Sequence, residues 1–261
     1  MTAQQGAPVA LVTGAGAGIG QAAARLFLER GYAVVAADAS ADALSWTKQA
    51  QSVLAVVGDV SLEADTEAMS QAALDRFGRL DAAVLNAGIA RRTDWEADDA
   101  VEAYDRIMAV NARGVVLGIR AAAPRMAAGA GGAIVVVAST SGVRADPQRF
   151  AYNASKAAAI NLARAAALDW ALRGVRVNVV APGPTETSIL QGGRLAPEHL
   201  AELVRPIPLQ RMGRPEEQAE AICFLASPAA SYITGAVLMC DGGITANVGI
   251  FPPPSRAGSD E

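Results

Sequence analysis

The residues best suited to chemistry are a tyrosine and a lysine four positions apart, Tyr152 and Lys156. On a helix this spacing puts the phenol and the ammonium one turn apart on the same face. A free phenol keeps its proton to about pH 10, but a nearby cation favours the phenolate, so the pair could transfer a proton near neutral pH. Ser139 follows the apolar run 133–138, a predicted buried strand, and its hydroxyl could hold a substrate oxygen. For the pair alone, an amphipathic helix start is the simpler interpretation.

A glycine-rich turn near the N-terminus joins a short apolar strand, 9–12, to a helix-forming run, 21–30. Gly14, Gly18 and Gly20 fit the spacing G-x-x-x-G-x-G rather than G-x-G-x-x-G. Glycines let the backbone approach a pyrophosphate closely, and the helix N-terminus adds unpaired N–H groups and a positive dipole end. Taken alone, the turn could equally be a tight strand-to-helix connection.

Asp38 ends a second predicted strand, 32–37, eighteen residues beyond Gly20. In a dinucleotide-binding unit an acid at this point bonds both ribose hydroxyls and repels a 2′-phosphate, although a strand-end aspartate is more often a helix cap. No cation that could bind that phosphate is supplied by the neighbouring positions, which are Ala15, Ala17, Ala39 and Ser40. The sequence therefore favours NAD(H) over NADP(H).

Strands and helices alternate through the chain, which predicts a doubly wound α/β fold with a parallel sheet, helices on both faces and ligands at the carboxyl ends of the strands. Asp59 follows the predicted strand 53–57, and Asn86-Ala87-Gly88 follows the strand 82–85. We expect both segments at the cofactor-binding edge of the sheet.

Asn111 lies inside a predicted helical stretch, 94–126. Asparagine is a poor interior helix residue unless its amide bonds a carbonyl or holds a water at a local distortion; a satisfied buried amide is the alternative. Gly114 and Gly118 would let a neighbouring element pack closely against the same helix.

Length and composition predict a single domain over residues 1–254, followed by a flexible tail, 255–261. Charged residues make up 18% of the chain and hydrophobic residues 52%, so an unusual share of the surface could be buried between subunits. The net charge of −4 leaves no basic stripe for a nucleic acid.

No metal site is expected from Cys223, Cys240 and His199, because their spacing fits no familiar zinc motif. We interpret the cysteines as reduced, buried thiols of a cytoplasmic protein. No signal peptide or membrane-spanning run is recognisable, so neither export nor a membrane is expected.

Seven motifs together resemble the short-chain dehydrogenase/reductase family in order and approximate spacing, over residues 8 to about 245. They are Thr13-Gly14-x-x-x-Gly18-Ile19-Gly20, Asn86-Ala87-Gly88, Asn111, Ser139, Tyr152-x-x-x-Lys156, Pro182-Gly183 and Asp241-Gly242-Gly243. The set is highly specific, although each motif alone is weak.

The resemblance implies roles for individual residues. Tyr152 would be the general acid/base, Lys156 would lower its pKa and bond the nicotinamide ribose, Ser139 would polarise the substrate oxygen, and Asn111 would hold a relay water. It also implies that Asp59 and Val60 lie at the adenine, Asn86 beside the adenosine ribose and the Thr187 hydroxyl near the nicotinamide amide. The expected cofactor contacts are Gly14, Gly18, Ile19, Gly20, Asp38, Asp59, Val60, Asn86, Ala87, Gly88, Tyr152, Lys156, Pro182, Gly183, Thr185 and Thr187.

The segment 184–214 has the least regular pattern and predicts a mobile substrate lid with one short helix. The loop between Ser139 and Tyr152 holds Ser141, Arg144 and Arg149 as candidate substrate contacts. Either arginine could bind a polar or anionic substrate group, although a solvated ion pair with Asp146 is the simpler interpretation.

The sequence thus predicts an NAD(H)-dependent oxidoreductase that interconverts a secondary alcohol and its ketone. In relatives the helices carrying Asn111 and Tyr152 form a four-helix interface, so a homotetramer is expected, with a dimer second. Two alternatives are an NAD-dependent epimerase or dehydratase on a sugar substrate, for whose larger C-terminal domain the chain has no room, and a catalytically idle NAD-binding protein. The particular alcohol, the direction and the stereochemistry do not follow from the sequence.

Overall fold

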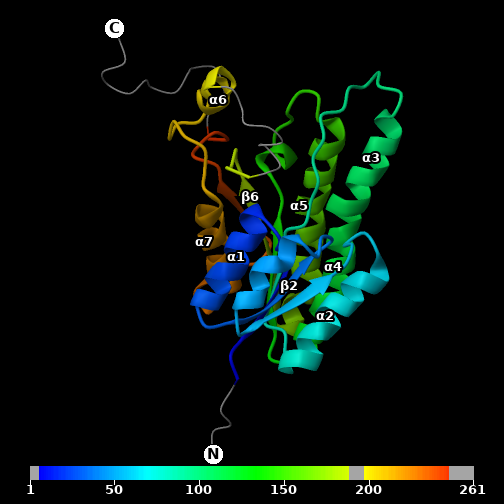
Figure 1. The fold of residues 1–261 in the computed structure, drawn as a ribbon, viewed down its shortest axis with the longest axis vertical. Coiled ribbons are helices and arrows are strands. Elements are labelled where there is room, and N and C mark those ends of the chain that lie inside the picture. Colours follow the sequence, from blue (N-terminus) through cyan, green and yellow to red (C-terminus); the bar gives the residue numbers. More distant parts are fainter. Residues whose placement is uncertain (1–5, 188–196, 247–261) are drawn as a thin grey trace, which may run out of the picture.

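A parallel seven-stranded sheet is the central layer of the residues that the computed structural model describes, 6–187 and 197–246 (Figure 1). The strands are β1 (Val9–Thr13), β2 (Ala33–Asp38), β3 (Val53–Val57), β4 (Ala82–Leu85), β5 (Gly132–Val137), β6 (Val175–Pro182) and β7 (Val237–Cys240). Their spatial order is β3-β2-β1-β4-β5-β6-β7. The order reverses direction between β1 and β4, and this switch point is where open α/β sheets bind ligands.

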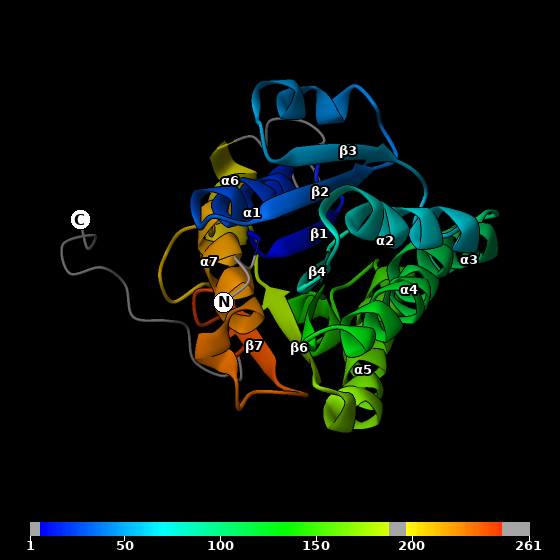
Figure 2. The same cartoon turned by 90° about the horizontal axis from the view of Figure 1, so that it is seen from below.

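Helices cover both faces of this sheet (Figure 2). The α-helices are α1 (Gly18–Glu29), α2 (Glu63–Phe77), α3 (Ala100–Met108), α4 (Gly114–Ala128), α5 (Phe150–Trp170), α6 (Pro197–Val204) and α7 (Pro215–Ala226). Helices α1 and α7 share one face, and α2, α4 and α5 lie over the other. The predicted doubly wound α/β fold is confirmed.

Alternating strand residues supply the two cores. In β1, Val9 and Leu11 face the cluster under α2, α4 and α5, whereas Ala10 and Val12 face the cluster under α1 and α7. A strand points successive side chains to opposite faces, so a strand buried on both sides needs a continuous apolar run. This requirement explains why the strands were recognisable from apolar runs alone.

The two glycines of α4 mark close packing, as expected. A Cβ atom on Gly118 would lie 2.6 Å from Leu85 Cδ2, and one on Gly114 would lie 3.1 Å from Val60 Cγ2. Helix α4 therefore approaches the sheet edge closely, and this brings the turn before it, with Asn111, toward the carboxyl ends of β4 and β5.

The predicted lid contains the expected short helix, α6. Its residues 188–196, and the expected tail 255–261, lie outside the described residues, so the lid's mobility and the tail's flexibility stay predictions. Within residues 6–187 and 197–246, no helix combines the length and apolar character needed to cross a membrane.

Candidate active site

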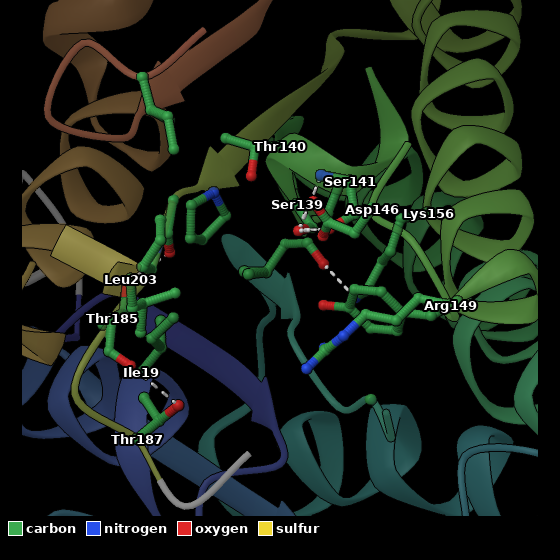
Figure 3. Close-up of a pocket in the computed structure, with 18 of the residues that line it drawn as sticks. Ile19, Ser139, Thr140, Ser141, Asp146, Arg149, Lys156, Thr185, Thr187 and Leu203 are labelled. Carbon is green, nitrogen blue, oxygen red and sulfur yellow. Dashed lines mark hydrogen bonds between the residues drawn. The ribbon is translucent and has the colours of Figure 1, made fainter. Parts of the chain in front are cut away.

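A cavity of about 630 Å³ opens at the carboxyl ends of β4, β5 and β6 (Figure 3). Ser139, Ser141 and Asp146 lie together on one wall, and Ile19, Thr185, Thr187 and Leu203 lie on the opposite wall. Of the predicted site residues, it is lined by Ile19, Asn86, Gly88, Ser139, Ser141, Arg149, Tyr152, Lys156, Pro182, Gly183, Thr185 and Thr187. The sheet thus brings residues from distant parts of the chain to one place.

Ser139 and Tyr152 meet across this cavity because β5 ends just before the serine and α5 begins just before the tyrosine. The Ser139 side chain is buried. Burial raises the pKa of the Tyr152 phenol above its ordinary value of 10.0, while a hydrogen bond with Ser139 and the charge of Arg149 act to lower it and the charge of Asp146 raises it. The phenol and the hydroxyl are therefore placed to share one substrate oxygen.

Lys156 is one turn further along α5, and its side chain is buried. Its Nζ atom donates to the carbonyl oxygen of Val137 at 3.0 Å and lies 5.7 Å from the centroid of the Tyr152 ring. Burial lowers the pKa of Lys156 from 10.5 to about 8. Burial raises the Tyr152 pKa, and the neighbouring cation that lowers it is Arg149. The effect of Lys156 on this pKa stays a prediction.

Asn111 sits in a five-residue π-helical turn, η2 (Ala109–Arg113), between α3 and α4. Its amide nitrogen donates to the Ile89 carbonyl at 2.9 Å and to Ser155 Oγ at 3.0 Å, and its amide oxygen accepts from the Ile89 N–H at 2.9 Å. The predicted local distortion and the bond to a carbonyl are both present. Because both amide hydrogens are engaged, a water bound to Asn111 would have to donate to one of its oxygens.

The glycine loop fits a dinucleotide pyrophosphate. Gly14 and Gly18 have φ angles of +65° and +53°, a left-handed conformation that side chains with a Cβ rarely adopt. A Cβ on Gly20 would lie 2.1 Å from the carbonyl oxygen of Gly14, so only glycine allows the first turn of α1 to approach the loop. The loop leaves its backbone N–H groups at the helix N-terminus, which suits an anion.

Asp38 and Asn86 tie this loop to the neighbouring strands. The Asp38 carboxylate accepts from the backbone N–H of Gly16 at 2.9 Å and of Ser40 at 3.0 Å. The Asn86 amide donates to the carbonyls of Thr13 at 3.0 Å and Gly14 at 3.3 Å, so it braces the loop rather than extending free into the cavity. The Asp38 carboxylate therefore lies next to the glycine loop.

The remaining predicted cofactor residues lie along the same carboxyl edge of the sheet but outside the lining of this cavity. They are Gly14, Gly18, Gly20, Asp38, Asp59, Val60 and Ala87. Hydrogen bonds from the backbone N–H and the hydroxyl of Ser61 hold the pKa of Asp59 below its ordinary range. The edge thus extends from the cavity toward β3, as an elongated dinucleotide requires.

The segment after β6 crosses this edge. Thr185 Oγ1 donates to the Gly183 carbonyl at 2.9 Å, and the Thr187 N–H donates to the Thr185 carbonyl at 2.8 Å. A Cβ on Gly18 would lie 3.1 Å from Thr187 Cγ2, so the Thr187 side chain reaches the glycine loop. The segment after β6 and the glycine loop therefore lie next to each other at the expected cofactor-binding edge.

The two candidate arginines take different positions. Arg149 lines the cavity, whereas Arg144 donates to the Thr245 carbonyl at 2.9 Å and is not part of its lining. Ser141 lines the cavity too, but its hydroxyl donates to Asp146 Oδ2 at 2.5 Å. The sequence did not single out the lining residues Arg92, Thr140, Pro147 and Ile244, because no motif marks them. Four further lining residues, Pro184, Glu202, Leu203 and Pro206, lie within the predicted substrate lid, 184–214.

Comparisons with known proteins agree with this arrangement. Residues 14–245 match the family model described as Enoyl-(Acyl carrier protein) reductase. The chain is 40% identical over 246 residues to the 2-(R)-hydroxypropyl-CoM dehydrogenase of Xanthobacter autotrophicus, covering 91% of this chain and 98% of the relative. It is 42% identical over 242 residues to the cis-4-hydroxycyclohexanecarboxylate dehydrogenase of Sinomonas cyclohexanicum, covering 91% and 96%. The chain belongs to the short-chain dehydrogenase/reductase family.

A solved structure of this family is also similar over its whole length. The 3-ketoacyl-(acyl-carrier-protein) reductase of Brucella melitensis, complexed with NADH, matches with a TM-score of 0.85 and 36% identity, covering 93% of this chain and 100% of that one. The protein is an oxidoreductase that acts on a CH–OH group of a small molecule with a nicotinamide cofactor. The motif resemblance seen in the sequence is thereby confirmed.

Proposed function

We propose that the protein interconverts a secondary alcohol and its ketone with NAD(H), using Ser139, Tyr152, Lys156 and Asn111. The observation that carries this proposal is the meeting of Ser139 and Tyr152 in a cavity next to a glycine loop whose neighbouring strand ends in Asp38. When bound, the nicotinamide accepts or donates the hydride.

The chain's own residues then have to move one proton. Tyr152 takes the hydroxyl proton of the alcohol during oxidation and returns it to the carbonyl oxygen during reduction. Lys156 lies one turn away on the same helix, where its charge, turned from Val137 toward a bound ribose, would favour the phenolate. Ser139 orients the substrate oxygen, and Asn111 supports a relay water through its oxygen atoms. These are the roles that the family resemblance implies, applied to the positions that the four residues have in this structure.

Asp38 supports a preference for NAD(H) over NADP(H). Its carboxylate is held by two backbone N–H groups at the end of β2, so it keeps a fixed negative charge at the edge where the adenosine ribose would lie. Ribose hydroxyls can donate to that carboxylate, while a 2′-phosphate would be repelled.

Arg149 supports a substrate that carries an anionic group. Its guanidinium lines the cavity and has no hydrogen-bond or ion-pair partner among residues 6–187 and 197–246. One relative is named for a hydroxycyclohexanecarboxylate, and a carboxylate is a bidentate partner for a guanidinium. We propose that Arg149, rather than Arg144, contacts the charged end of such a substrate.

Two separate exposed apolar faces support a homotetramer. Val101, Val116 and Leu168 are exposed on α3, α4 and α5, and Phe224 and Leu238 are exposed on α7 and β7. A tetramer with dihedral symmetry needs two different self-complementary faces, whereas a dimer needs one.

A matched pair of substrates tests the proposed function. Initial rates are measured with NAD⁺ and NADP⁺ on cyclohexanol and on cis-4-hydroxycyclohexanecarboxylate, which differ by one carboxylate. We expect turnover with NAD⁺ and a higher kcat/KM for the carboxylate. NAD⁺ binding without turnover across an alcohol and ketone panel would favour the idle NAD-binding alternative, and inverted stereochemistry of a sugar substrate would favour the epimerase.

Arginine variants test the substrate contact. Arg149→Ala should lower kcat/KM for the carboxylate about tenfold or more, because charged hydrogen bonds contribute about 1.5–3 kcal/mol, and should change the cyclohexanol value far less. Arg144→Ala is the matched control and should affect both substrates alike. An equal loss on both substrates in Arg149→Ala would retire the proposed contact.

A further inference from the structure

A chain of hydrogen bonds runs from the reacting wall of the cavity to a carboxylate in the loop before α5. Ser139 Oγ lies 3.1 Å from Ser141 Oγ, and Ser141 Oγ lies 2.5 Å from Asp146 Oδ2. The backbone N–H of Ser141 also donates to Ser139 Oγ at 3.1 Å. Figure 3 shows the three side chains grouped on one wall. Neither the proposed function nor the motif pattern uses Asp146.

We propose that Asp146 is a positioning residue that acts through Ser141 to turn the hydroxyl hydrogen of Ser139 away from the substrate. In the resting enzyme, Ser139 then offers its oxygen as a hydrogen-bond acceptor, and the site binds an alcohol in preference to a ketone. This inference rests on the proposed function, because it concerns the ligands of that same site.

The direction of each hydrogen bond follows from the donors available. An ionised carboxylate can only accept, so the Ser141 hydroxyl must donate to Asp146. A serine hydroxyl has a single hydrogen, so Ser141 can then only accept from Ser139. The hydrogen of Ser139 is thereby committed to Ser141. One lone pair of Ser139 accepts from the backbone N–H of Ser141, and the other bonds the Tyr152 phenol until a substrate hydroxyl takes its place.

The backbone of Asp146 is held in place by the first turn of α5. The side-chain amide of Asn153 donates to the Asp146 carbonyl at 2.9 Å, and its oxygen accepts from the Asp146 N–H at 3.3 Å. Asn153 is the neighbour of Tyr152 in the chain. The loop that carries Asp146 is therefore fixed relative to the helix that carries the phenol.

An alcohol and a ketone meet this arrangement differently. An alcohol hydroxyl can replace the Tyr152 phenol as the donor to Ser139 and can accept from that phenol through its own oxygen, so the bonds from Ser139 to Ser141 and from Ser141 to Asp146 stay intact. A carbonyl oxygen can only accept, so Ser139 must turn its hydrogen away from Ser141 and lose that bond. A neutral hydrogen bond contributes about 0.5–1.5 kcal/mol net, which corresponds to an affinity difference of about threefold to tenfold.

Asp146 also acts on the phenol by its charge. The charged side chains that line the cavity with Tyr152 are Asp146 and Arg149 in the loop before α5, Lys156 on α5, Arg92 beside Gln148 and Glu202 on α6. Among these, Asp146 raises the pKa of Tyr152 and Arg149 lowers it. Removing the Asp146 charge should therefore lower the Tyr152 pKa and move the acid limb of alcohol oxidation to lower pH.

Equilibrium binding to complexes that cannot react tests the inference. Cyclohexanol is titrated into enzyme saturated with NADH, and cyclohexanone into enzyme saturated with NAD⁺, by calorimetry. The ratio of kcat/KM for oxidation to kcat/KM for reduction cannot make this comparison, because the equilibrium constant of the reaction fixes that ratio and no variant can change it. The variants are Ser141→Ala and Asp146→Ala, with Asp75→Ala on the exposed side of α2 as the control.

Ser141→Ala keeps the carboxylate but removes the acceptor for Ser139, so the Kd of cyclohexanone should fall about threefold to tenfold while that of cyclohexanol changes less than about twofold. Asp146→Ala should give the same change in ligand preference and, because it also removes a charge, a larger shift of the acid limb to lower pH than Ser141→Ala gives. Asp75→Ala should give neither effect.

One result would overturn the inference, namely a ratio of the two Kd values in Ser141→Ala that stays within about twofold of the wild-type ratio. An equal weakening of both ligands is one form of this result, and a merely structural role of the loop would produce it. A wild-type enzyme whose cofactor complexes bind neither ligand would contradict the proposed function itself, and this inference with it.

Discussion

Lys156 should make the folded protein less stable than a methionine at the same position near neutral pH. Its side chain is buried, and its Nζ atom has one hydrogen-bond partner among the described residues, the Val137 carbonyl at 3.0 Å. Burial lowers the pKa of Lys156 from 10.5 to about 8, and no carboxylate pairs with it in residues 6–187 and 197–246. Methionine would fill a similar volume without a charge to desolvate.

The size and sign of the effect follow from this pKa. The difference of 10.5 minus about 8 corresponds to about 3 kcal/mol of destabilisation when both the folded and unfolded states are protonated. Losing the hydrogen bond to Val137 offsets about 1–2 kcal/mol of that. Lys156→Met should therefore gain about 1–2 kcal/mol at pH 7, or roughly 2–8 °C in Tm for a chain of this size.

The gain should depend on pH in one direction. The penalty of the buried ammonium is fully present below about pH 8 and fades as the pH rises toward 10.5, because the folded state then releases its proton first. Thermal unfolding of the cofactor-free protein between pH 6 and about 10.5 measures this difference.

The exposed lysine provides the control. Lys48→Met should leave Tm unchanged at every pH. Lys156→Met, in addition to its gain in stability, should lose most of the oxidoreductase activity. A Lys156→Met protein that is less stable than wild type at pH 7, or equally stabilised at pH 7 and near pH 10.5, would refute the reasoning.

Further variants test the cofactor edge and the packing. Asp38→Asn should shift the ratio of kcat/KM for NAD⁺ to that for NADP⁺ toward NADP⁺ by about tenfold or more. The reason is that the repulsion between a carboxylate and a phosphate charge about 4 Å away costs about 1–4 kcal/mol of binding free energy. Asp42→Asn changes an exposed neighbour and should leave the ratio within about twofold. Gly118→Ala should lower the free energy of unfolding by about 1–3 kcal/mol, because its Cβ would lie 2.6 Å from Leu85 Cδ2. Gly6→Ala, whose Cβ meets nothing within 4 Å, is its control, and equal stabilities of the two variants would contradict the packing argument.

Much of the fold could be predicted because each strand of a doubly wound sheet, and the turn that follows it, has a recognisable short sequence pattern. Apolar runs marked the buried strands, and the residue after each run marked the carboxyl edge where a site can form. Ser139, Asn86 and Asp38 were found in this way, although they are far apart in sequence. Asn111 was found because a polar amide inside a helix needs a reason, and the π-helical turn supplies it.

The electrostatics of the site could not be predicted from spacing. The spacing of four positions from Tyr152 to Lys156 places the two groups on one face of a helix. It says nothing about how deeply α5 buries them, and burial decides the direction of both pKa shifts. The hydrogen-bond partner of Asp146 could also not be predicted. An ion pair with Arg144 or Arg149 was the simpler interpretation, whereas the loop conformation directs the carboxylate to Ser141.

The most direct test of the central claim is single-turnover hydride transfer in Tyr152→Phe, measured as NADH formation after enzyme and NAD⁺ are mixed with an alcohol. The account predicts that the variant binds NAD⁺ with nearly wild-type affinity and transfers hydride at least about a hundredfold more slowly, because it lacks the group that takes the proton. Hydride transfer at the wild-type rate in Tyr152→Phe, or a wild-type protein that does not bind NAD(H), would contradict it.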